Sequence, residues 1–233
     1  MVSPAPAPGA TTAGITPVRR STLGDDVYES LKSLIMEHSL APQDRVNIDA
    51  VARKLEVSPT PVREALARLE SEGLVRKRPL AGYTVSPLLT RQEFTDMFDM
   101  RLVLEGAAAR WAAERATADL RGDIVREADT TVDLGEPAAD GHRSHAAFTA
   151  LDARFHDLIA EAANNPLLRD GIIRLHAHLH IHRLYFPYAQ TGTTSEEHQR
   201  IAAAIRAGDG DSAEVAMRAH LSAARARHLP AFD

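Results

Sequence analysis

Two apolar stripes separated by an unusually short turn constrain the N-terminal part of this chain more than any other feature. Apolar residues recur at helical spacing in the segments 48–55 and 58–69, at Ile48, Val51, Ala52, Leu55, Val62, Leu66 and Leu69. Each stripe is typical of one buried face of a short amphipathic helix. Asn47 and Ser58 are suited to cap these helices, and Pro59 fits a first helical turn, where no backbone N–H is needed. The sequence therefore predicts two helices joined by a tight turn.

A third helical segment precedes this pair and a hairpin follows it. Residues 23–38 carry an apolar stripe, and after Gly73 the helical pattern gives way to two short strand-like runs, 74–78 and 83–85. Three helices and a hairpin predict a winged helix-turn-helix, whose second motif helix enters the major groove of DNA. Arg63, on the free side of that helix, is the first predicted DNA contact. The wing carries a basic edge at Arg76, Lys77 and Arg78.

The distribution of charge is compatible with DNA binding in this part of the chain. The net charge of the 233 residues is −5, but residues 19–87 hold 11 basic against 10 acidic side chains, whereas 88–233 hold 16 against 22. A DNA-binding module needs only a local basic surface, and an acidic partner domain can face elsewhere. The overall acidity therefore does not exclude a DNA partner.

The remainder of the chain predicts helices only. Helical spacing covers about 91–115, 117–134, 140–163, 166–185, 194–207 and 211–228. The predicted fold is mainly α, with an N-terminal winged helix-turn-helix and an all-α bundle. Its expected parts are a disordered tail over 1–18, rich in Pro, Ala and Gly, a DNA-binding domain over 19–87, and a helical effector-binding and dimerisation domain over 88–233.

Several classes of protein are excluded or disfavoured by composition. The chain has no cysteine, which excludes disulfides, thiolate metal sites and cysteine nucleophiles. No apolar run approaches the roughly 20 residues that span a bilayer, so we expect a cytoplasmic protein without a membrane partner. The sequence also lacks a P-loop, a Gly-rich dinucleotide turn and a serine nucleophile elbow, so we do not expect an enzyme.

Acidic and histidine side chains give the second part its chemical signal. Asp152 and His156 are four residues apart, so they lie on one face of a helix and can share a metal ion, or form an ordinary surface hydrogen bond. His198 and His220 lie on two later helices. Four more histidines, at 176, 178, 180 and 182, split into two opposed pairs on one helix and cannot all bind one ion.

The residues from Val57 to Leu66, followed by Arg68 and Leu69 and by the segment 72–75, resemble the GntR family of regulators. The resemblance covers about 23–87 and implies that Ser58, Thr60 and Arg63 contact DNA and that Gly82 forms the wing turn at the minor groove. Arg68, Arg76 and Lys77 complete the predicted DNA-binding set.

The pattern of Asp152, His156, His198 and His220 resembles the metal-binding FCD domain of the FadR-like branch of the GntR family. The resemblance implies one divalent ion on these four side chains, and such ligands suit Zn²⁺, Ni²⁺ or Mn²⁺ equally. It also implies that Arg101 contacts the effector and that Asn165 lies near its pocket. An ion pair of Arg101 with Glu105, four residues on, and a helix cap at Asn165 are the alternatives.

The expected function is that of a homodimeric transcriptional regulator, and of a repressor in particular, that binds double-stranded operator DNA under the control of a small carboxylate effector near the metal. One alternative is a metal sensor, in which the ion itself is the signal. The other is a metal-dependent hydrolase using His156 and Asp157, although adjacent helical residues point about 100° apart.

Overall fold

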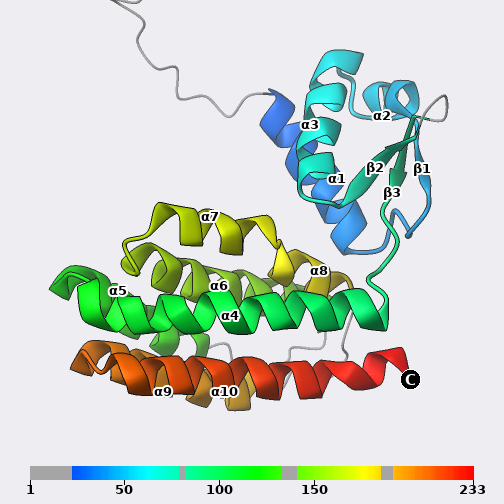
Figure 1. The fold of residues 1–233 in the computed structure, drawn as a ribbon. Coiled ribbons are helices and arrows are strands. Elements are labelled where there is room, and N and C mark those ends of the chain that lie inside the picture. The colour runs from blue at the N-terminus through cyan, green and yellow to red at the C-terminus, as the bar shows by residue number, and fades with distance from the viewer. Residues whose placement is uncertain (1–22, 79–81, 133–140, 185–190) are drawn as a thin grey trace, which may run out of the picture.

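A computed structural model describes residues 23–78, 82–132, 141–184 and 191–233 of this chain (Figure 1). The N-terminal part forms a small domain of helices and a sheet, and the C-terminal part forms a larger domain of helices only. This arrangement confirms the predicted fold class. The expected tail over 1–18 and the tip of the wing lie outside the described residues.

The N-terminal domain contains the predicted three helices and hairpin. These elements are α1 (Leu23–Met36), α2 (Ile48–Lys54), α3 (Pro59–Ser71), β2 (Val75–Arg78) and β3 (Gly82–Val85). The predicted apolar stripes meet in one core, in which Val62, Leu66 and Leu69 are fully buried. Asn47 caps α2 by accepting a hydrogen bond from the backbone N–H of Ala50, as predicted.

The sheet has one more strand than the sequence predicted. Strand β1 (Arg45–Val46) pairs antiparallel with β3, so the strand order is β1-β3-β2. Two residues are too few to produce an alternation of apolar and polar positions, which is the signal on which strand prediction depends. The additional strand ties the loop before α2 to the wing.

The C-terminal domain packs its helices around α4 (Arg91–Arg115). Helix α4 runs alongside α10 (Gly210–His228) and also contacts α6 (Gly141–Ala162), α7 (Pro166–Arg174) and α9 (Thr191–Ala207) (Figure 1). Four alanines of α4, at 108, 109, 112 and 113, are buried in this core and allow the helices to approach closely. The remaining elements are α5 (Ala118–Val132), α8 (Ala177–Arg183) and a 3₁₀ turn (Leu229–Phe232). None of the described helices is long and apolar enough to cross a membrane.

The predicted helix over 166–185 is wrong, because the chain forms two helices there. His176 has a φ of 44°, in the left-handed region, and separates α7 from α8. Histidine adopts this conformation more readily than most residues, but neither Gly nor Pro marks the break in the sequence. The break changes the direction of the helix that carries His178 and His182.

Helix α8 also joins the two domains. The Nε2 atom of His38, just after α1, lies 2.9 Å from the carbonyl oxygen of Arg183. The Arg183 guanidinium is buried and donates a hydrogen bond to the carbonyl oxygen of Ser86, in the segment that connects the domains. Leu179 packs against the core of the N-terminal domain. The short helix therefore contacts the N-terminal domain along its length.

Candidate metal centre and ligand cavity

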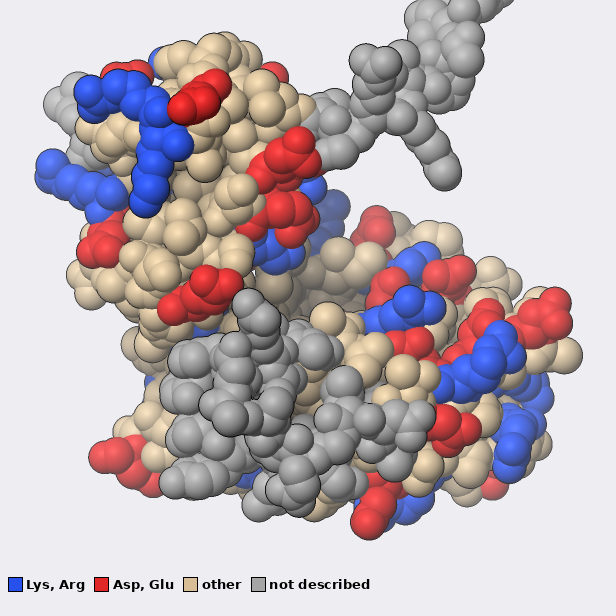
Figure 2. Space-filling view, turned by 180° about the vertical axis from the view of Figure 1, so that it is seen from behind, with Lys and Arg blue, Asp and Glu red and all other residues tan. Residues whose placement is uncertain are grey.

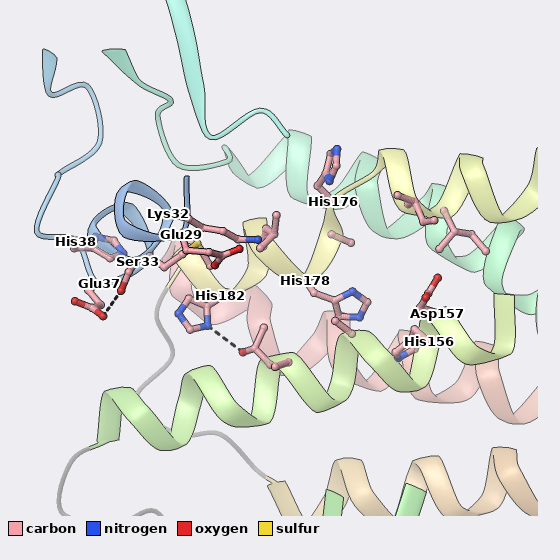
Figure 3. A pocket seen from close by; sticks show the side chains of 18 of the residues that line it. Glu29, Lys32, Ser33, Glu37, His38, His156, Asp157, His176, His178 and His182 are labelled. Atoms are coloured by element: carbon pink, nitrogen blue, oxygen red, sulfur yellow. Dashed lines mark hydrogen bonds between the residues drawn. The ribbon is translucent and has the colours of Figure 1, made fainter. Parts of the chain in front are cut away.

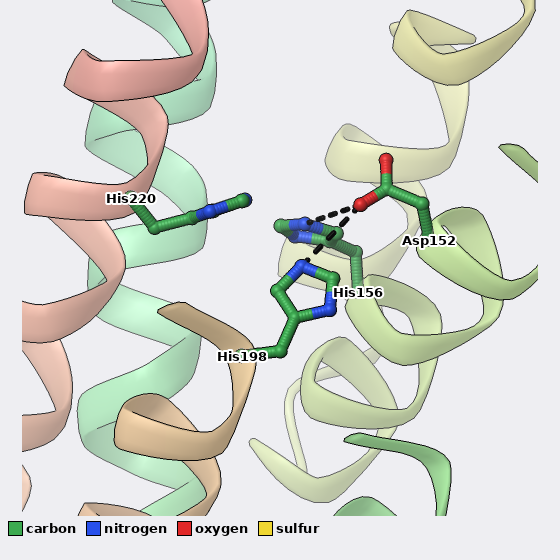
Figure 4. A group of neighbouring side chains, drawn as sticks. All are labelled: Asp152, His156, His198 and His220. Atoms are coloured by element: carbon green, nitrogen blue, oxygen red, sulfur yellow. Dashed lines mark ion pairs between the residues drawn. The ribbon is translucent and has the colours of Figure 1, made fainter. Parts of the chain in front are cut away.

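Four side chains from three helices converge inside the C-terminal domain (Figure 4). Asp152 and His156 come from α6, His198 from α9 and His220 from α10, and one ligand atom of each lies within 4.8 Å of those of the other three. The Oδ1 atom of Asp152 is 3.3 Å from Nε2 of His198 and 3.9 Å from Nε2 of His156. All three histidines are buried. The fold thus brings together the four residues proposed as ligands from the sequence.

The histidine nitrogens fit a bound cation better than they fit the surrounding protein. Among the described residues, Nε2 of His156 and both ring nitrogens of His198 are buried without a hydrogen-bond partner. A buried nitrogen in this state costs about 1–3 kcal/mol, which coordination of an ion would offset. Three imidazoles and one carboxylate are ligands that divalent transition metals accept. We conclude that the residues present suit such an ion.

Neighbouring side chains hold the imidazole rings in place. The Nδ1 atom of His220 lies 2.8 Å from Oε2 of Glu197, whose carboxylate also accepts two hydrogen bonds from Arg227. The ring of Phe155 stacks on that of His198 with 4.0 Å between centroids. Carboxylates behind metal-binding histidines commonly fix the ring orientation and raise the basicity of the coordinating nitrogen.

The protonation states also suit metal binding. Burial lowers the pKa of His220 to about 4, and it lowers the pKa of His198 as well, so both rings are neutral at pH 7. Burial alone would raise the pKa of Asp152, but the imidazoles of His198, His178 and His156 outweigh it and hold this pKa well below its usual range. Neutral imidazole and ionised carboxylate are the forms that bind metals.

Arg101 lies beside the centre, in a buried ion pair. Its Nε donates to Oε1 of Glu105 at 2.6 Å, and both side chains are almost fully buried. The other carboxylate oxygen of Glu105 is 2.5 Å from Nδ1 of His156. The structure therefore contains the alternative pair of Arg101 with Glu105, but inside the domain and not on its surface. An effector carboxylate would have to use the Nη atoms of Arg101.

His178 is the functional candidate that sequence reasoning left unassigned. Its Nε2 atom lies 3.4 Å from Oδ2 of Asp152 and 3.3 Å from Nη2 of Arg101. His182, four residues on, contacts the hydroxyl of Thr149 at 3.0 Å. The spacing had separated this pair from His176 and His180, but the direction in which the pair points depends on the break at His176.

A cavity of about 1180 Å³ leads from this region to the N-terminal domain (Figure 3). Glu105, His156 and His178 line one end, and the residues of α1 that line the other include Lys32, Ser33 and Met36. Figure 3 shows the labelled α1 side chains on one side of the cavity, His156 on the other, and His178 between them. Sequence reasoning missed the α1 wall, because nothing in residues 23–38 points to a contact with the second domain.

Two further sequence candidates have structural partners of their own. The side chain of Asn165 accepts a hydrogen bond from the backbone N–H of Leu168 at 3.1 Å and so caps α7. Its role in effector binding stays a prediction. The carboxylate of Asp157 is bonded to Arg169 at 2.8 and 3.0 Å and is not part of the metal cluster. A metal site built from His156 and Asp157 is therefore not what the structure forms.

The predicted DNA contacts are all exposed, and one of them, Arg68, has a partner within its own domain. Ser58, Thr60 and Arg63, at the start of α3, are exposed, as are Arg76 and Lys77 on β2 and Gly82, whose φ of 77° lies in the left-handed region that favours glycine. Figure 2 shows Lys and Arg side chains gathered at the end of this domain that is remote from the bundle.

Arg68 lies further along α3 and contacts α1 instead. Its Nη1 is 2.6 Å from Oδ1 of Asp25, and its guanidinium lies over the ring of Tyr28 at 3.8 Å. A contact of this residue with DNA would have to compete with this arrangement. The DNA contacts as a set stay predictions.

Two family models match successive parts of the chain. A model of bacterial regulatory proteins of the gntR family matches residues 23–85, and a model of the FCD domain matches residues 96–223. The HTH-type transcriptional regulator LutR of Bacillus subtilis is 29% identical over 211 residues, which cover 81% of this chain and 93% of LutR. A putative L-lactate dehydrogenase operon regulatory protein of Escherichia coli is 29% identical over 225 residues, covering 86% and 84%.

Solved structures show the same fold. A putative transcriptional regulator GntR from Rhodococcus sp. RHA1 superposes with a TM-score of 0.70 at 21% identity, covering 90% of this chain and 99% of that one. The McbR/YncC protein of E. coli superposes with a TM-score of 0.70 at 21% identity, covering 91% and 99%.

Proposed function

Because the chain belongs to the GntR family of bacterial regulatory proteins and carries an FCD domain, we propose that a small organic acid, bound near a divalent metal, controls its binding to operator DNA. The chain is a transcriptional regulator and not an enzyme. The winged helix-turn-helix binds DNA, with Ser58, Thr60 and Arg63 of α3 in the major groove and the wing residues Arg76, Lys77 and Gly82 at the flanking backbone and minor groove.

The observation that carries this proposal is the convergence of Asp152, His156, His198 and His220 on one buried point, with histidine nitrogens that form no hydrogen bond. These side chains would hold Zn²⁺, Ni²⁺ or Mn²⁺. The bound ion supplies positive charge and positions open to an oxygen ligand. The charge of the ion favours an anionic ligand, although the helical domain as a whole has more acidic than basic residues.

The effector carboxylate lies at the end of the cavity where His156 and His178 are found. The positive charge of Arg101, whose Nη2 is 3.3 Å from Nε2 of His178, favours an anion there. The name of the E. coli relative makes L-lactate the first acid to test on this protein. Release of DNA on binding, and therefore repression in its absence, is the regulation we propose.

Regulation also requires two copies of the chain. A single winged helix offers few base contacts, and a two-fold dimer reads a palindrome with twice as many. Helix α4 exposes Met100 and Val103, which are three residues apart and share a face. We propose that this face of the helical domain contributes to a homodimer. Such a regulator works in the cytoplasm, where it meets the chromosome.

The metal itself is a second candidate signal, favoured by one observation. The Nε edge of Arg101, which would contribute to a two-point clamp on a carboxylate, is already bonded to Glu105. In this alternative, loading of Asp152, His156, His198 and His220 changes the affinity for DNA without any acid.

Fluorescence anisotropy on a labelled operator, selected from a random duplex library, tests both candidates. The metal-free protein, the metal-loaded protein, and the metal-loaded protein with L-lactate and other short acids are compared. Release of DNA only when metal and an acid are both present supports the proposal. A change in affinity on metal loading that no acid alters further contradicts it and supports the metal sensor. The same loading of a His198→Ala, His220→Ala variant is the control, since both signals should disappear.

A further inference from the structure

Helix α8 lies between the two domains and packs against both. Ala177 and Ile181, four residues apart on one face, belong to an apolar cluster shared with α4 of the helical domain. Leu179 packs against the core of the N-terminal domain, and the ring of His180 lies beside Gly73, just after α3. Leu179 is two residues from both Ala177 and Ile181, and residues two apart on a helix point to nearly opposite sides. The helix therefore presents one side to each domain.

The contact between α8 and the N-terminal domain contains a buried charge that no acidic group balances. Arg183 is 2% exposed, and the described residues include no carboxylate within ion-pair distance of it. Its Nε atom and the hydroxyl of Ser86 are both buried without a hydrogen bond. Burial and the nearby charge of Arg76 on β2 lower the pKa of Arg183 to about 10, so it is charged at pH 7. An unbalanced buried charge costs free energy, which the apolar contacts of α8 must offset. Such departures from good packing are expected where a protein changes its state.

The same helix reaches the metal centre through His178. Its Nε2 atom lies 3.4 Å from Oδ2 of the proposed ligand Asp152 and 3.3 Å from Nη2 of Arg101. An ion at the centre would fix the Asp152 carboxylate and change the charge that His178 faces. His178 is followed directly by Leu179, so a shift of α8 at the centre also shifts the side that packs on the N-terminal domain. The left-handed backbone at His176 separates α8 from α7, which leaves α8 free to tilt by itself.

We propose that α8 couples the metal centre to the N-terminal domain. His178 responds to the state of Asp152, while Leu179 and Arg183 hold the N-terminal domain against the bundle. An ion that fixes Asp152 fixes its contact with His178 and so tightens this hold. Coupling of this kind requires a packed, rigid element whose arrangement both sites influence, and α8 contacts both. This inference rests on the metal centre proposed above and adds the element that transmits its occupancy.

Hydrogen exchange measured by mass spectrometry tests the proposal on the full-length protein, metal-free and loaded with Zn²⁺. The readout is the segment 35–40, which follows α1 and contacts α8 through His38. The amides of His38 and Leu40 donate to the carbonyl oxygens of Ile35 and Leu34, so their exchange reports the opening of this turn. Coupling between sites commonly amounts to about fivefold or more, so exchange in α8 and at 35–40 should slow by about that factor on loading.

Two leucines provide a matched pair of variants. Leu179 packs on the core of the N-terminal domain, whereas Leu175, four residues earlier, packs on the cluster of the helical domain, and both are partly buried. Leu179→Ala should keep the slowing in α8 and lose it at 35–40. Leu175→Ala should keep both. His178→Ala tests the other side of α8: it should still bind Zn²⁺, because His178 is not among the four proposed ligands, and should lose the slowing in both segments.

The outcomes separate this inference from the proposed metal centre. If Zn²⁺ slows exchange in α6, α9 and α10 of the wild type but not at 35–40, or if Leu179→Ala responds as Leu175→Ala does, α8 is not the coupling element while the metal centre stands. If elemental analysis finds no metal in the loaded wild type, the metal centre is wrong and the coupling with it.

Discussion

Removal of the Arg101 side chain tests whether the ion pair beside the metal centre is as deeply buried as its geometry indicates. Arg101 and Glu105 are 2% and 3% exposed as side chains, and their closest atoms are 2.6 Å apart. Burial alone would raise the pKa of Glu105, but Arg101 and His156 outweigh it and hold that pKa below its usual range. In Arg101→Ala the carboxylate loses its main positive neighbour and stays buried.

The expected cost is large because one partner of a buried pair is left without the other. Such a loss destabilises proteins by about 3–5 kcal/mol. Contact of Glu105 with His156 offsets part of this cost, so we expect about 3 kcal/mol. For a denaturant slope of about 3 kcal/mol per molar urea, the unfolding midpoint falls by about 1 M.

Trp111 on α4 makes the measurement specific to the helical domain, since it is the only tryptophan in the chain. Its fluorescence is followed during urea unfolding of the metal-free protein. Arg110→Ala is the control on the same helix, because the Arg110 side chain is 36% exposed and its pairs with Asp211 and Glu214 lie near the surface. Exposed pairs contribute under about 1 kcal/mol. Equal losses in the two variants would refute the reasoning.

The stability difference between the wild type and Arg101→Ala should depend on pH with a definite sign. In the wild type the depressed pKa of Glu105 contributes stability that is fully present above about pH 4.3, the unfolded value, and is lost only below it. In Arg101→Ala the buried Glu105 carboxylate should have a raised pKa. Uptake of a proton removes its charge and should reduce the destabilisation of the variant. The stability difference between the two proteins should therefore narrow between pH 7 and pH 5, and a widening gap would contradict this account.

Four further predictions concern the metal, the DNA and the contact between domains. Replacing His198 and His220 together by Ala should remove the ion and lower Tm relative to the metal-loaded wild type. A ligand at a thousandfold excess over Kd stabilises the folded state by about 4 kcal/mol, and the variant loses this contribution. A full equivalent of metal found in the variant by elemental analysis would contradict the assigned ligands. Arg63→Ala should weaken operator binding by about 1–3 kcal/mol in a gel-shift assay with the circular dichroism spectrum unchanged, and an affinity equal to that of the wild type would show that Arg63 does not contact DNA. Arg68→Ala, whose side chain contacts α1, should lower stability more than it lowers affinity if the structural partner dominates. His38→Ala removes the ring that contacts the α8 carbonyl and should cost about 0.5–1.5 kcal/mol, seen as faster hydrogen exchange in α8, whereas unchanged exchange would mean that the contact contributes nothing.

The sequence predicted those parts of the fold in which apolar residues recur at a regular spacing. The apolar stripe of α3 places Val62, Leu66 and Leu69 in the core, and the structure buries all three. Strand β1 was missed because two residues carry no period. The break at His176 was missed because neither Gly nor Pro marks its left-handed backbone in the sequence.

The candidate site, too, could be predicted only where a local spacing marks it. Asp152 and His156 could be paired from their spacing alone, because a helix fixes the geometry of residues four apart. The supporting carboxylates could not be assigned, since Glu105 and Glu197 meet their histidines only in the folded bundle. The wall of α1 depends on how two domains pack, which no local pattern in either domain records.

The position of the ligands along the chain has a consequence for biosynthesis. The winged helix ends near residue 85, whereas the last proposed ligand, His220, lies 135 residues further along the chain. At roughly 5–20 residues per second of translation, about 7–27 seconds pass between the synthesis of these two points. During that interval the ribosome-bound chain contains the winged helix but not yet all the residues of the proposed metal centre. A nascent chain of this kind lacks part of the proposed metal centre, so any response to a signal follows the synthesis of the helical domain.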